Sequence, residues 1–423
     1  MSLFKQFIPS DFVKNVFTLM SGTVFAQGIA VLLYPALSRI YSPSEFGEIT
    51  LYMSIASAFA IIATARYERA IVIASNEQEA IALLKISHRV SIGIVLLNLI
   101  LVIGFILFFQ HHIYMTSSFK TWLFIMPVFT LLYGSSQAIT HWFIRKKYFH
   151  EMAVSKIINS LGINGGMLIL GLAGLGLLGL YVANLAGLFA IALYLIFIFY
   201  KRDYTLFHQK LELKTVAKKY SDFPKTNSLQ ALIEMFQMNG VVYLLGIFFS
   251  SMCVGLYSFS MKVLMAPMWI IGTSLSQVFY QKASEEYSQT HNLRPLFKKT
   301  LRNISLIALP IFAIIMIGGP AIFSFVFGKE WYEAGVYAQI LAPWIFLDFI
   351  KAPLSQIPII TGRIKNMFVI TLIGNIILIL TMILGKVFNN EKIAFFSLSV
   401  GMSIYVILLI FWIYKVSVPK HEP

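Results

Sequence analysis

The chain has 423 residues, of which 58% are hydrophobic and only 12% are charged, and its mean hydropathy is +0.79. The apolar share is well above that of soluble globular domains, so the composition excludes an ordinary soluble protein. The charge is one-sided, with 33 Lys and Arg against 18 Asp and Glu. For so apolar a chain, an anionic lipid surface suits these cations better than a nucleic acid does.

Apolar segments long enough to cross a bilayer recur along the whole chain. A crossing needs about 20 mostly apolar residues. We therefore predict an all-α integral membrane protein with about twelve transmembrane helices. The predicted spans are residues 16–37, 49–73, 90–109, 121–144, 157–173, 178–200, 228–249, 254–280, 304–327, 337–361, 367–387 and 393–414.

The longest stretch between spans predicts the domain organisation. Residues 201–227 are basic, and they separate an N-terminal six-helix lobe (1–200) from a C-terminal six-helix lobe (228–423). If the N-terminus is cytoplasmic, 26 of the 33 Lys and Arg residues lie on the cytoplasmic side and five on the other. Basic residues accumulate in cytoplasmic loops, so both termini and the 201–227 linker are predicted to be cytoplasmic.

Two segments of the sequence echo each other, as expected for a transporter built from repeats. Residues 42–55 and 250–263 each follow the first span of a half, and each places a glycine, Gly47 or Gly255, at the start of a new span.

A separate segment, 162–179, is rich in glycine. Small residues let helices approach closely, so this segment predicts a tight helical hairpin.

Polar stripes within the predicted spans carry most of the functional information, because polar and ionisable groups are costly in hydrocarbon unless they face a cavity or a partner. The fourth, seventh and eighth spans each place polar side chains three or four residues apart, on one helical face. We predict that these faces line a common lumen, although hydrogen bonding between helices is the alternative for each. The candidate substrate-binding residues on them are Gln137, His141, Arg145, Gln230, Lys262 and Trp269.

Three acidic residues within spans, Glu68, Glu234 and Asp348, are candidates for ion coupling. Asp348 and Lys351 are three residues apart and can pair on one helix. Similar depths in the membrane also predict that Lys262 approaches Asp348, and that Glu234 approaches Lys351, in at least one conformation. Fixed structural ion pairs are the alternative.

The second span contains Arg66, Glu68 and Arg69, followed by further apolar residues. On a continuous helix Arg66 and Arg69 share one face, and Glu68 points elsewhere. The planar fork of arginine matches phosphate oxygens. Arg66 and Arg69 are therefore further candidates for binding an anionic substrate, and Lys351 is another because it is a cation within a span. For the two arginines, the alternative is that their side chains extend to the inner headgroups.

Motifs of enzymes are missing from the sequence. It contains no HExxH, P-loop, nucleophile elbow or Asp-rich metal pair, and these are the patterns that metalloprotease, nucleotide-binding and hydrolase chemistry needs. We expect a transporter without catalytic residues, metal or cofactor.

Several stretches of the sequence resemble one family of membrane proteins. They include LSRIYSPSEFGEITLYMSI, ATARYERAIVIA, YSDFPKTNSLQALI, VGLYSFSMKVLMAPMWIIGTSLSQVFYQKAS and FGKEWYEAGVYAQILAPW. In these the chain resembles the polysaccharide (O-antigen type) flippases, called Wzx, of the multidrug/oligosaccharidyl-lipid/polysaccharide exporter superfamily. The resemblance implies two lobes around a central V-shaped cavity. It also places RYE at Arg66 to Glu68 as in relatives, and a Lys at 262 where relatives commonly have Arg.

The resemblance further implies a function in surface polysaccharide biosynthesis, such as that of O-antigen and lipopolysaccharide. The substrate would be an undecaprenyl-diphosphate-linked oligosaccharide, moved from the cytoplasmic to the outer leaflet of a bacterial inner membrane and coupled to H⁺ or Na⁺. A polysaccharide polymerase and a chain-length regulator are the implied protein partners, beside membrane lipids. The alternatives are a multidrug/cation antiporter of the same superfamily and a membrane-embedded polysaccharide polymerase.

Overall fold

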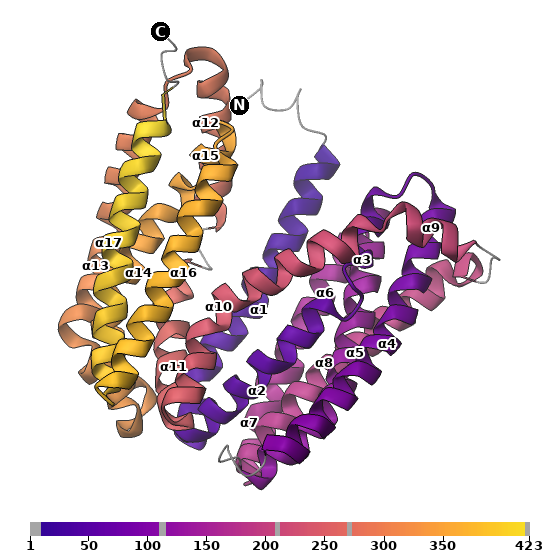
Figure 1. Cartoon of the computed structure of the whole chain (residues 1–423), viewed down its shortest axis with the longest axis horizontal. Coiled ribbons are helices and arrows are strands. Elements are labelled where there is room, and N and C mark those ends of the chain that lie inside the picture. Colours follow the sequence, from indigo (N-terminus) through magenta and orange to yellow (C-terminus); the bar gives the residue numbers. More distant parts are fainter. Residues whose placement is uncertain (1–9, 110–115, 208–211, 269–272, 419–423) are drawn as a thin grey trace. The chain divides into compact units, whose positions relative to one another are not determined.

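The structure is a computed structural model that describes residues 10–109, 116–207, 212–268 and 273–418. These residues form helices, and none of them is in a strand (Figure 1). The helices of the first half are α1 (Ser10–Ile40), α2 (Pro43–Ile62), α3 (Tyr67–Ile73), α4 (Glu77–Phe109), α5 (Ser117–Lys146), α6 (Phe149–Ser160), a π-helix (Leu161–Gly165), α7 (Gly166–Leu172), α8 (Gly176–Phe207), α9 (Leu213–Lys219) and a second π-helix (Phe223–Asn227). Those of the second half are α10 (Ser228–Phe248), α11 (Ser251–Pro267), α12 (Thr273–Thr290), α13 (Arg294–Phe327), a 3₁₀-helix (Lys329–Trp331), α14 (Tyr332–Leu354), α15 (Ile357–Ile360), α16 (Ile364–Val387) and α17 (Glu391–Val416).

Within the described ranges, eleven helical segments are long and apolar enough to cross a membrane, and the shorter apolar segment Ser251–Ala266 is a candidate for a twelfth crossing. The predicted all-α, multi-pass membrane fold is confirmed. The predicted span 254–280 is not described as one helix, because α11 ends at Pro267 and α12 begins at Thr273. Trp269, a predicted substrate-binding residue, lies outside the described residues.

Tertiary contacts divide the chain into two compact units. The first unit comprises Met1–Tyr41 and Glu48–Asn239, and the second comprises Ser42–Gly47 and Gly240–Pro423. One boundary therefore falls inside α10, and the first turn of α2 belongs to the second unit. Each unit thus takes residues from both halves of the sequence.

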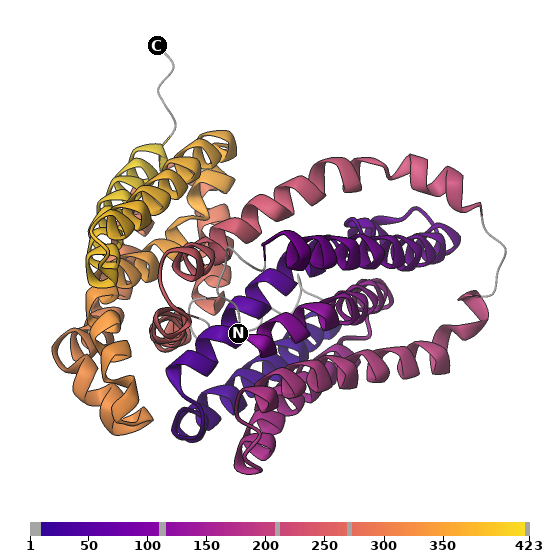
Figure 2. The ribbon, with the colours of Figure 1, turned by 60° about the horizontal axis from the view of Figure 1, so that its bottom comes forward.

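In the first unit, α5 and α8 are the helices against which most others pack. α5 contacts α3, α4 and α8, while α8 also contacts α6 and α7. Figure 2 shows the long helices of this unit running side by side. The glycine-rich segment 162–179 forms the predicted hairpin, in which α7 turns into α8. Gly174 in this turn has a φ of +79°, a left-handed conformation that glycine adopts without steric cost.

A buried carboxylate joins α5 to α8 in the first unit. Asp203 is 3% exposed and accepts a hydrogen bond from Nε1 of Trp142 at 2.9 Å, while Nζ of Lys146 lies 4.0 Å away. Replacing Asp203 by leucine removes the acceptor and leaves the buried indole N–H unpaired. We expect the free energy of unfolding to fall by about 1–3 kcal/mol. Thermal unfolding of the purified protein measures this loss, and Asp222→Leu, at an exposed carboxylate, is the control that should change little.

Part of the basic segment 201–227 is attached to the first unit. α9 packs against α4, and Nζ of Lys219 donates to Oε1 of Glu79 at 2.6 Å and to Oγ of Ser75 at 3.1 Å. The hydrogen bond to the Glu79 carboxylate raises the pKa of Lys219 above its usual value. The hydroxyl of Tyr220 donates to the same carboxylate at 2.9 Å, so α9 is held at the end of α4.

In the second unit, α14 is the central helix. It packs against α11, α12, α13 and α17, and Figure 1 shows α13, α14 and α17 running side by side. α14 ends at Leu354, directly after Pro353, and α15 begins at Ile357. The predicted span 337–361 is therefore interrupted, as expected where proline removes a backbone donor.

An aromatic cluster fills one end of the second unit. Phe259 of α11 lies 4.0 Å from Trp331, centroid to centroid, and 4.9 Å from Phe327. Phe46, from the first turn of α2, joins the cluster at 5.8 Å from Phe259 and 5.4 Å from Trp331. Trp331 is fully buried and Phe46 is 3% exposed.

The first turn of α2 also touches the first turn of α11 backbone to backbone. A Cβ placed on Gly47 would lie 1.7 Å from the carbonyl oxygen of Ser251, and one placed on Gly255 would lie 1.8 Å from that of Pro43. The contact is reciprocal, since each glycine faces the residue four positions before the other glycine. The two matching glycines of the sequence repeat therefore meet in the fold.

Candidate functional site

The chain leaves helical geometry between α2 and α3, at the position of Arg66. Ala65 has a φ of 45° and Arg66 a φ of 62°. Residues other than glycine rarely adopt this left-handed conformation, and such strain concentrates at functional sites. The predicted span 49–73 is thus interrupted at residues 63–66, and α3 begins at Tyr67.

The Arg66 guanidinium is buried and only partly satisfied. Arg66 is 7% exposed, and its Nη1 lies 3.5 Å from Oε1 of Glu68. The hydroxyl of Thr64 donates to the other oxygen of that carboxylate. Nε of Arg66 has no hydrogen-bond partner among the described residues. A buried donor left unpaired costs about 1–3 kcal/mol, so a ligand oxygen is favoured beside this atom.

The prediction that Glu68 points away from Arg66 is wrong. It assumed one continuous helix, whereas the left-handed residues Ala65 and Arg66 place Arg66 just outside α3, where the helical spacing does not apply. Glu68 itself is 2% exposed. The break therefore creates a buried ion pair between residues only two positions apart.

Two further helices of the first unit bring polar groups toward Arg66. Glu234 of α10 and Tyr133 of α5 both interact electrostatically with its guanidinium. Gln230 Nε2 donates to Oε1 of Glu234 at 2.9 Å, and Gln137 Nε2 donates to the Tyr133 hydroxyl at 2.8 Å. One residue of each stripe predicted on the fourth and seventh spans thus lies within electrostatic range of the arginine. We call Thr64, Arg66, Glu68, Tyr133 and Glu234 the Arg66 cluster.

The other predicted residues of the first unit lie around this cluster. Arg69 is exposed and interacts electrostatically with Arg66. Nδ1 of His141 lies 2.9 Å from the carbonyl oxygen of Gln137. Nη1 of Arg145 donates to three carbonyl groups at the end of α3, at 3.1, 3.3 and 2.8 Å. Arg145 therefore holds the short helix that carries the glutamate of the ion pair.

In the second unit, two of the charged residues of α14 pair with each other. Lys351 forms an ion pair with Asp348, as their spacing predicts. Lys262 of α11 has its Nζ 5.6 Å from the centre of the Phe46 ring. The predicted approach of Lys262 to Asp348 stays a prediction. The predicted approach of Glu234 to Lys351 also stays a prediction, because the two residues belong to different units.

Two groups that the sequence did not single out as partners lie near this ion pair. Trp344, one turn before Asp348, is 8% exposed, and its Nε1 has no hydrogen-bond partner in the described part of the chain. Tyr405 of α17 interacts electrostatically with Lys351 and Asp348. A single Tyr in a long apolar span gives almost no sequence signal for a role in a polar site.

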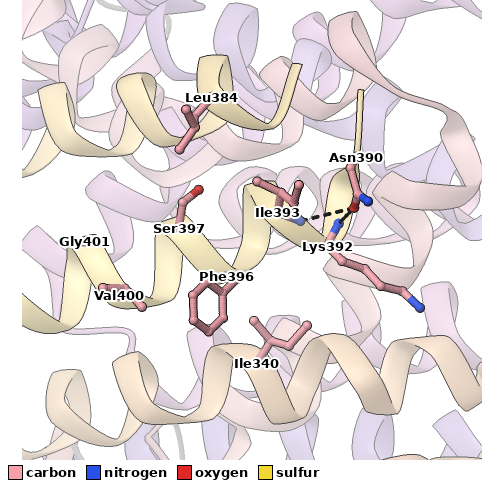
Figure 3. A pocket seen from close by; sticks show the side chains of 9 residues that line it. All are labelled: Ile340, Leu384, Asn390, Lys392, Ile393, Phe396, Ser397, Val400 and Gly401. Carbon is pink, nitrogen blue, oxygen red and sulfur yellow. Dashed lines mark hydrogen bonds between the residues drawn. The ribbon is translucent and has the colours of Figure 1, made fainter. Parts of the chain in front are cut away.

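An apolar groove lies elsewhere in the second unit, between α14, α16 and α17. It encloses about 670 Å³, and Figure 3 shows Ile340, Leu384 and Phe396 around it. At one end, Asn390 Oδ1 accepts hydrogen bonds from the first backbone N–H groups of α17, and Lys392 pairs with Glu333 at 2.9 Å. None of the predicted site residues lines this groove, and its lining suits hydrocarbon rather than phosphate.

Comparisons with known proteins identify the family and the fold. Residues 36–335 match the model of a family described as polysaccharide biosynthesis protein. No curated protein sequence matches the chain. Among solved structures, an inward-facing multidrug resistance MATE family transporter of the MOP superfamily is 15% identical, with 94% of each chain covered and a TM-score of 0.64.

Two other solved structures share this fold. The lipid II flippase MurJ in an inward closed conformation is 15% identical, with 96% of this chain and 89% of that chain covered and a TM-score of 0.68. A MOP superfamily transporter from Pyrococcus furiosus is 10% identical, with 96% of each chain covered and a TM-score of 0.58. The chain therefore has the fold of MOP superfamily transporters.

Proposed function

This chain belongs to the polysaccharide biosynthesis protein family, and we propose that it is a flippase for an undecaprenyl-diphosphate-linked oligosaccharide. It moves this lipid from the cytoplasmic to the outer leaflet of a bacterial inner membrane by alternating access. The family and the transporter fold support this function. The observation that carries it is the buried Arg66, whose Nε lacks a partner among the described residues.

The Arg66 cluster has the chemistry that a diphosphate headgroup needs. Arginine binds phosphate oxygens through two parallel N–H donors, and such charge-assisted hydrogen bonds are about twice as strong as neutral ones. Without substrate, Glu68 holds the guanidinium by its Nη1. A diphosphate oxygen takes the place of this carboxylate and also accepts from Nε. The prenyl tail can remain in lipid throughout.

The same exchange supplies a route for ion coupling. When Arg66 turns to the diphosphate, Glu68 loses its cation and is left as a buried carboxylate. A buried carboxylate without a partner takes up a proton or a cation. Glu234 is exposed and interacts electrostatically with the same guanidinium, so it is a second candidate for binding the coupling ion. Asp348 with Lys351 offers a comparable pair in the second unit.

The pairing of the acids favours an anionic substrate over the alternative of multidrug/cation antiport. A cationic substrate needs carboxylates that are free to neutralise it. Of the three predicted ion-coupling acids, Glu68 and Asp348 each pair with a basic residue of their own unit. The unsatisfied group in the Arg66 cluster is instead a donor, which an anion satisfies.

Neutralising the acids singly tests the coupling. We expect Glu234→Gln to lower the flipping rate at least about tenfold and to flatten its dependence on pH or sodium. Asp348→Asn should have the same effect if the Asp348–Lys351 ion pair takes part in ion coupling. The measurement is translocation of a lipid-linked oligosaccharide in proteoliposomes, with pH and sodium varied separately.

The matched control is Glu285→Gln, on the exposed face of α12, where Gln281 at 3.2 Å is the one donor to the carboxylate among the described residues. This variant should flip at the wild-type rate. Translocation that keeps its full rate and ion dependence in both Glu234→Gln and Asp348→Asn contradicts the coupling. Failure of the wild-type protein to translocate the lipid contradicts the proposed function itself.

A further inference from the structure

Five cations lie near one end of the second unit, where α13 begins and α17 ends. All five side chains are exposed. None forms an ion pair with a carboxylate of the described residues. We call this set the basic surface; it consists of Arg294, Lys298, Lys299, Arg302 and Lys415.

Three cations of the basic surface lie over aromatic rings of α17. The guanidinium carbon of Arg294 lies 5.0 Å from the centre of the Tyr414 ring, and Nζ of Lys298 lies 5.8 Å from it. Lys415 lies over the neighbouring Phe411 ring at 4.6 Å. A backbone hydrogen bond of 2.8 Å from Leu293 ties the start of α13 to the end of α17. Cation–π contacts thus hold charges from two distant parts of the chain at one place.

The length of α13 places these cations at headgroup depth. A helix of 34 residues is about 51 Å long, whereas the hydrocarbon core of a bilayer is about 30 Å thick. Arg294, Lys298 and Arg302 recur every four residues, so they share one face of the polar first turns. The distribution of Lys and Arg along the chain predicts that this end faces the cytoplasm.

We propose that the basic surface is a binding site for the phosphate of an anionic phospholipid in the inner leaflet. Neighbouring like charges without acids repel one another, and a bound phosphodiester relieves this repulsion. Each Lys or Arg near an anionic membrane strengthens binding about fivefold. A zwitterionic lipid has no net charge to offer. The basic surface belongs to the second unit and shares no residue with the Arg66 cluster, so the proposal does not rest on the proposed function.

The test compares phosphatidylglycerol with phosphatidylcholine on the purified full-length protein in detergent. Native mass spectrometry counts the bound lipids, and thermal unfolding with each lipid added gives an apparent affinity. We expect phosphatidylglycerol to be retained in preference to phosphatidylcholine. In Arg294→Gln/Lys298→Gln, this preference should fall at least about tenfold. Tyr414→Leu keeps every charge but removes the shared ring, and it should lower the preference less.

The control is Lys329→Gln/Lys386→Gln, which removes two exposed cations of the same unit outside the basic surface. It should leave the preference intact. An equal fall in this control overturns the proposal, because overall charge would then explain binding. An unchanged preference in Arg294→Gln/Lys298→Gln overturns it as well. So does full displacement of the lipid by millimolar inorganic phosphate, which would make the surface a site for the free ion.

Discussion

Replacing Arg66 by glutamine should abolish flipping and destabilise the fold. The change leaves the Glu68 carboxylate buried without its cation, and breaking a buried pair in this way costs about 3–5 kcal/mol. It also removes the donors that a diphosphate would use. Thermal unfolding measures the first effect, and translocation of the lipid-linked oligosaccharide in proteoliposomes measures the second.

The double variant Arg66→Gln/Glu68→Gln separates these two effects. Both charges are removed, so most of the stability should return, since neutral replacements of a buried ion pair are often tolerated. The cluster still lacks a cation, and we expect flipping to stay about 100-fold below the wild-type rate. A folded double variant that flips as fast as the wild type would show that the pair is only structural.

Replacing Gly255 by alanine should destabilise the protein by about 1–3 kcal/mol or more, as overpacking does. The added Cβ would lie 1.8 Å from the carbonyl oxygen of Pro43, so the first turns of α2 and α11 must separate. Gly47→Ala should cost a similar amount, because it meets Ser251 in the same way. Since both changes open one contact, the double variant should lose less than the sum. Thermal unfolding in detergent measures all three.

Two glycines of α4 provide the matched control. A Cβ on Gly93 or Gly104 would have no atom within 4 Å. Gly93→Ala and Gly104→Ala should therefore be neutral or slightly stabilising, because alanine favours helix more than glycine does. If Gly255→Ala is as stable as Gly93→Ala, the close approach of α2 and α11 is not maintained in the protein.

The sequence predicts those features of the fold that local composition determines. A run of about 20 apolar residues forms a spanning helix whatever its neighbours are, so the all-α membrane fold could be predicted. The glycine density of 162–179 likewise predicts the hairpin of α7 and α8. The repeat that aligns Gly47 with Gly255 identified two residues that touch, although the sequence alone gave no reason to expect contact between them.

Features that depend on backbone strain or distant contacts could not be predicted. The ion pair of Arg66 with Glu68 needs two left-handed residues, Ala65 and Arg66, and no glycine marks them. Helical spacing places Arg145 on the predicted polar stripe, but it does not reveal that Nη1 of Arg145 donates to carbonyl groups at the end of α3. That arrangement depends on the packing of α3 against α5, which helical spacing within one span does not describe.

The place of Phe46 has a consequence for the biogenesis of the protein. Phe46 precedes Glu48–Asn239, the larger segment of the first unit, yet its ring completes the aromatic cluster of Phe259 and Trp331 in the second unit. On the ribosome it is made more than two hundred residues before either partner. The helices synthesised after residue 240 therefore cannot complete the core of the second unit by themselves. They also need Phe46, which is inserted long before them. The two repeats of the sequence are not two independently maturing halves.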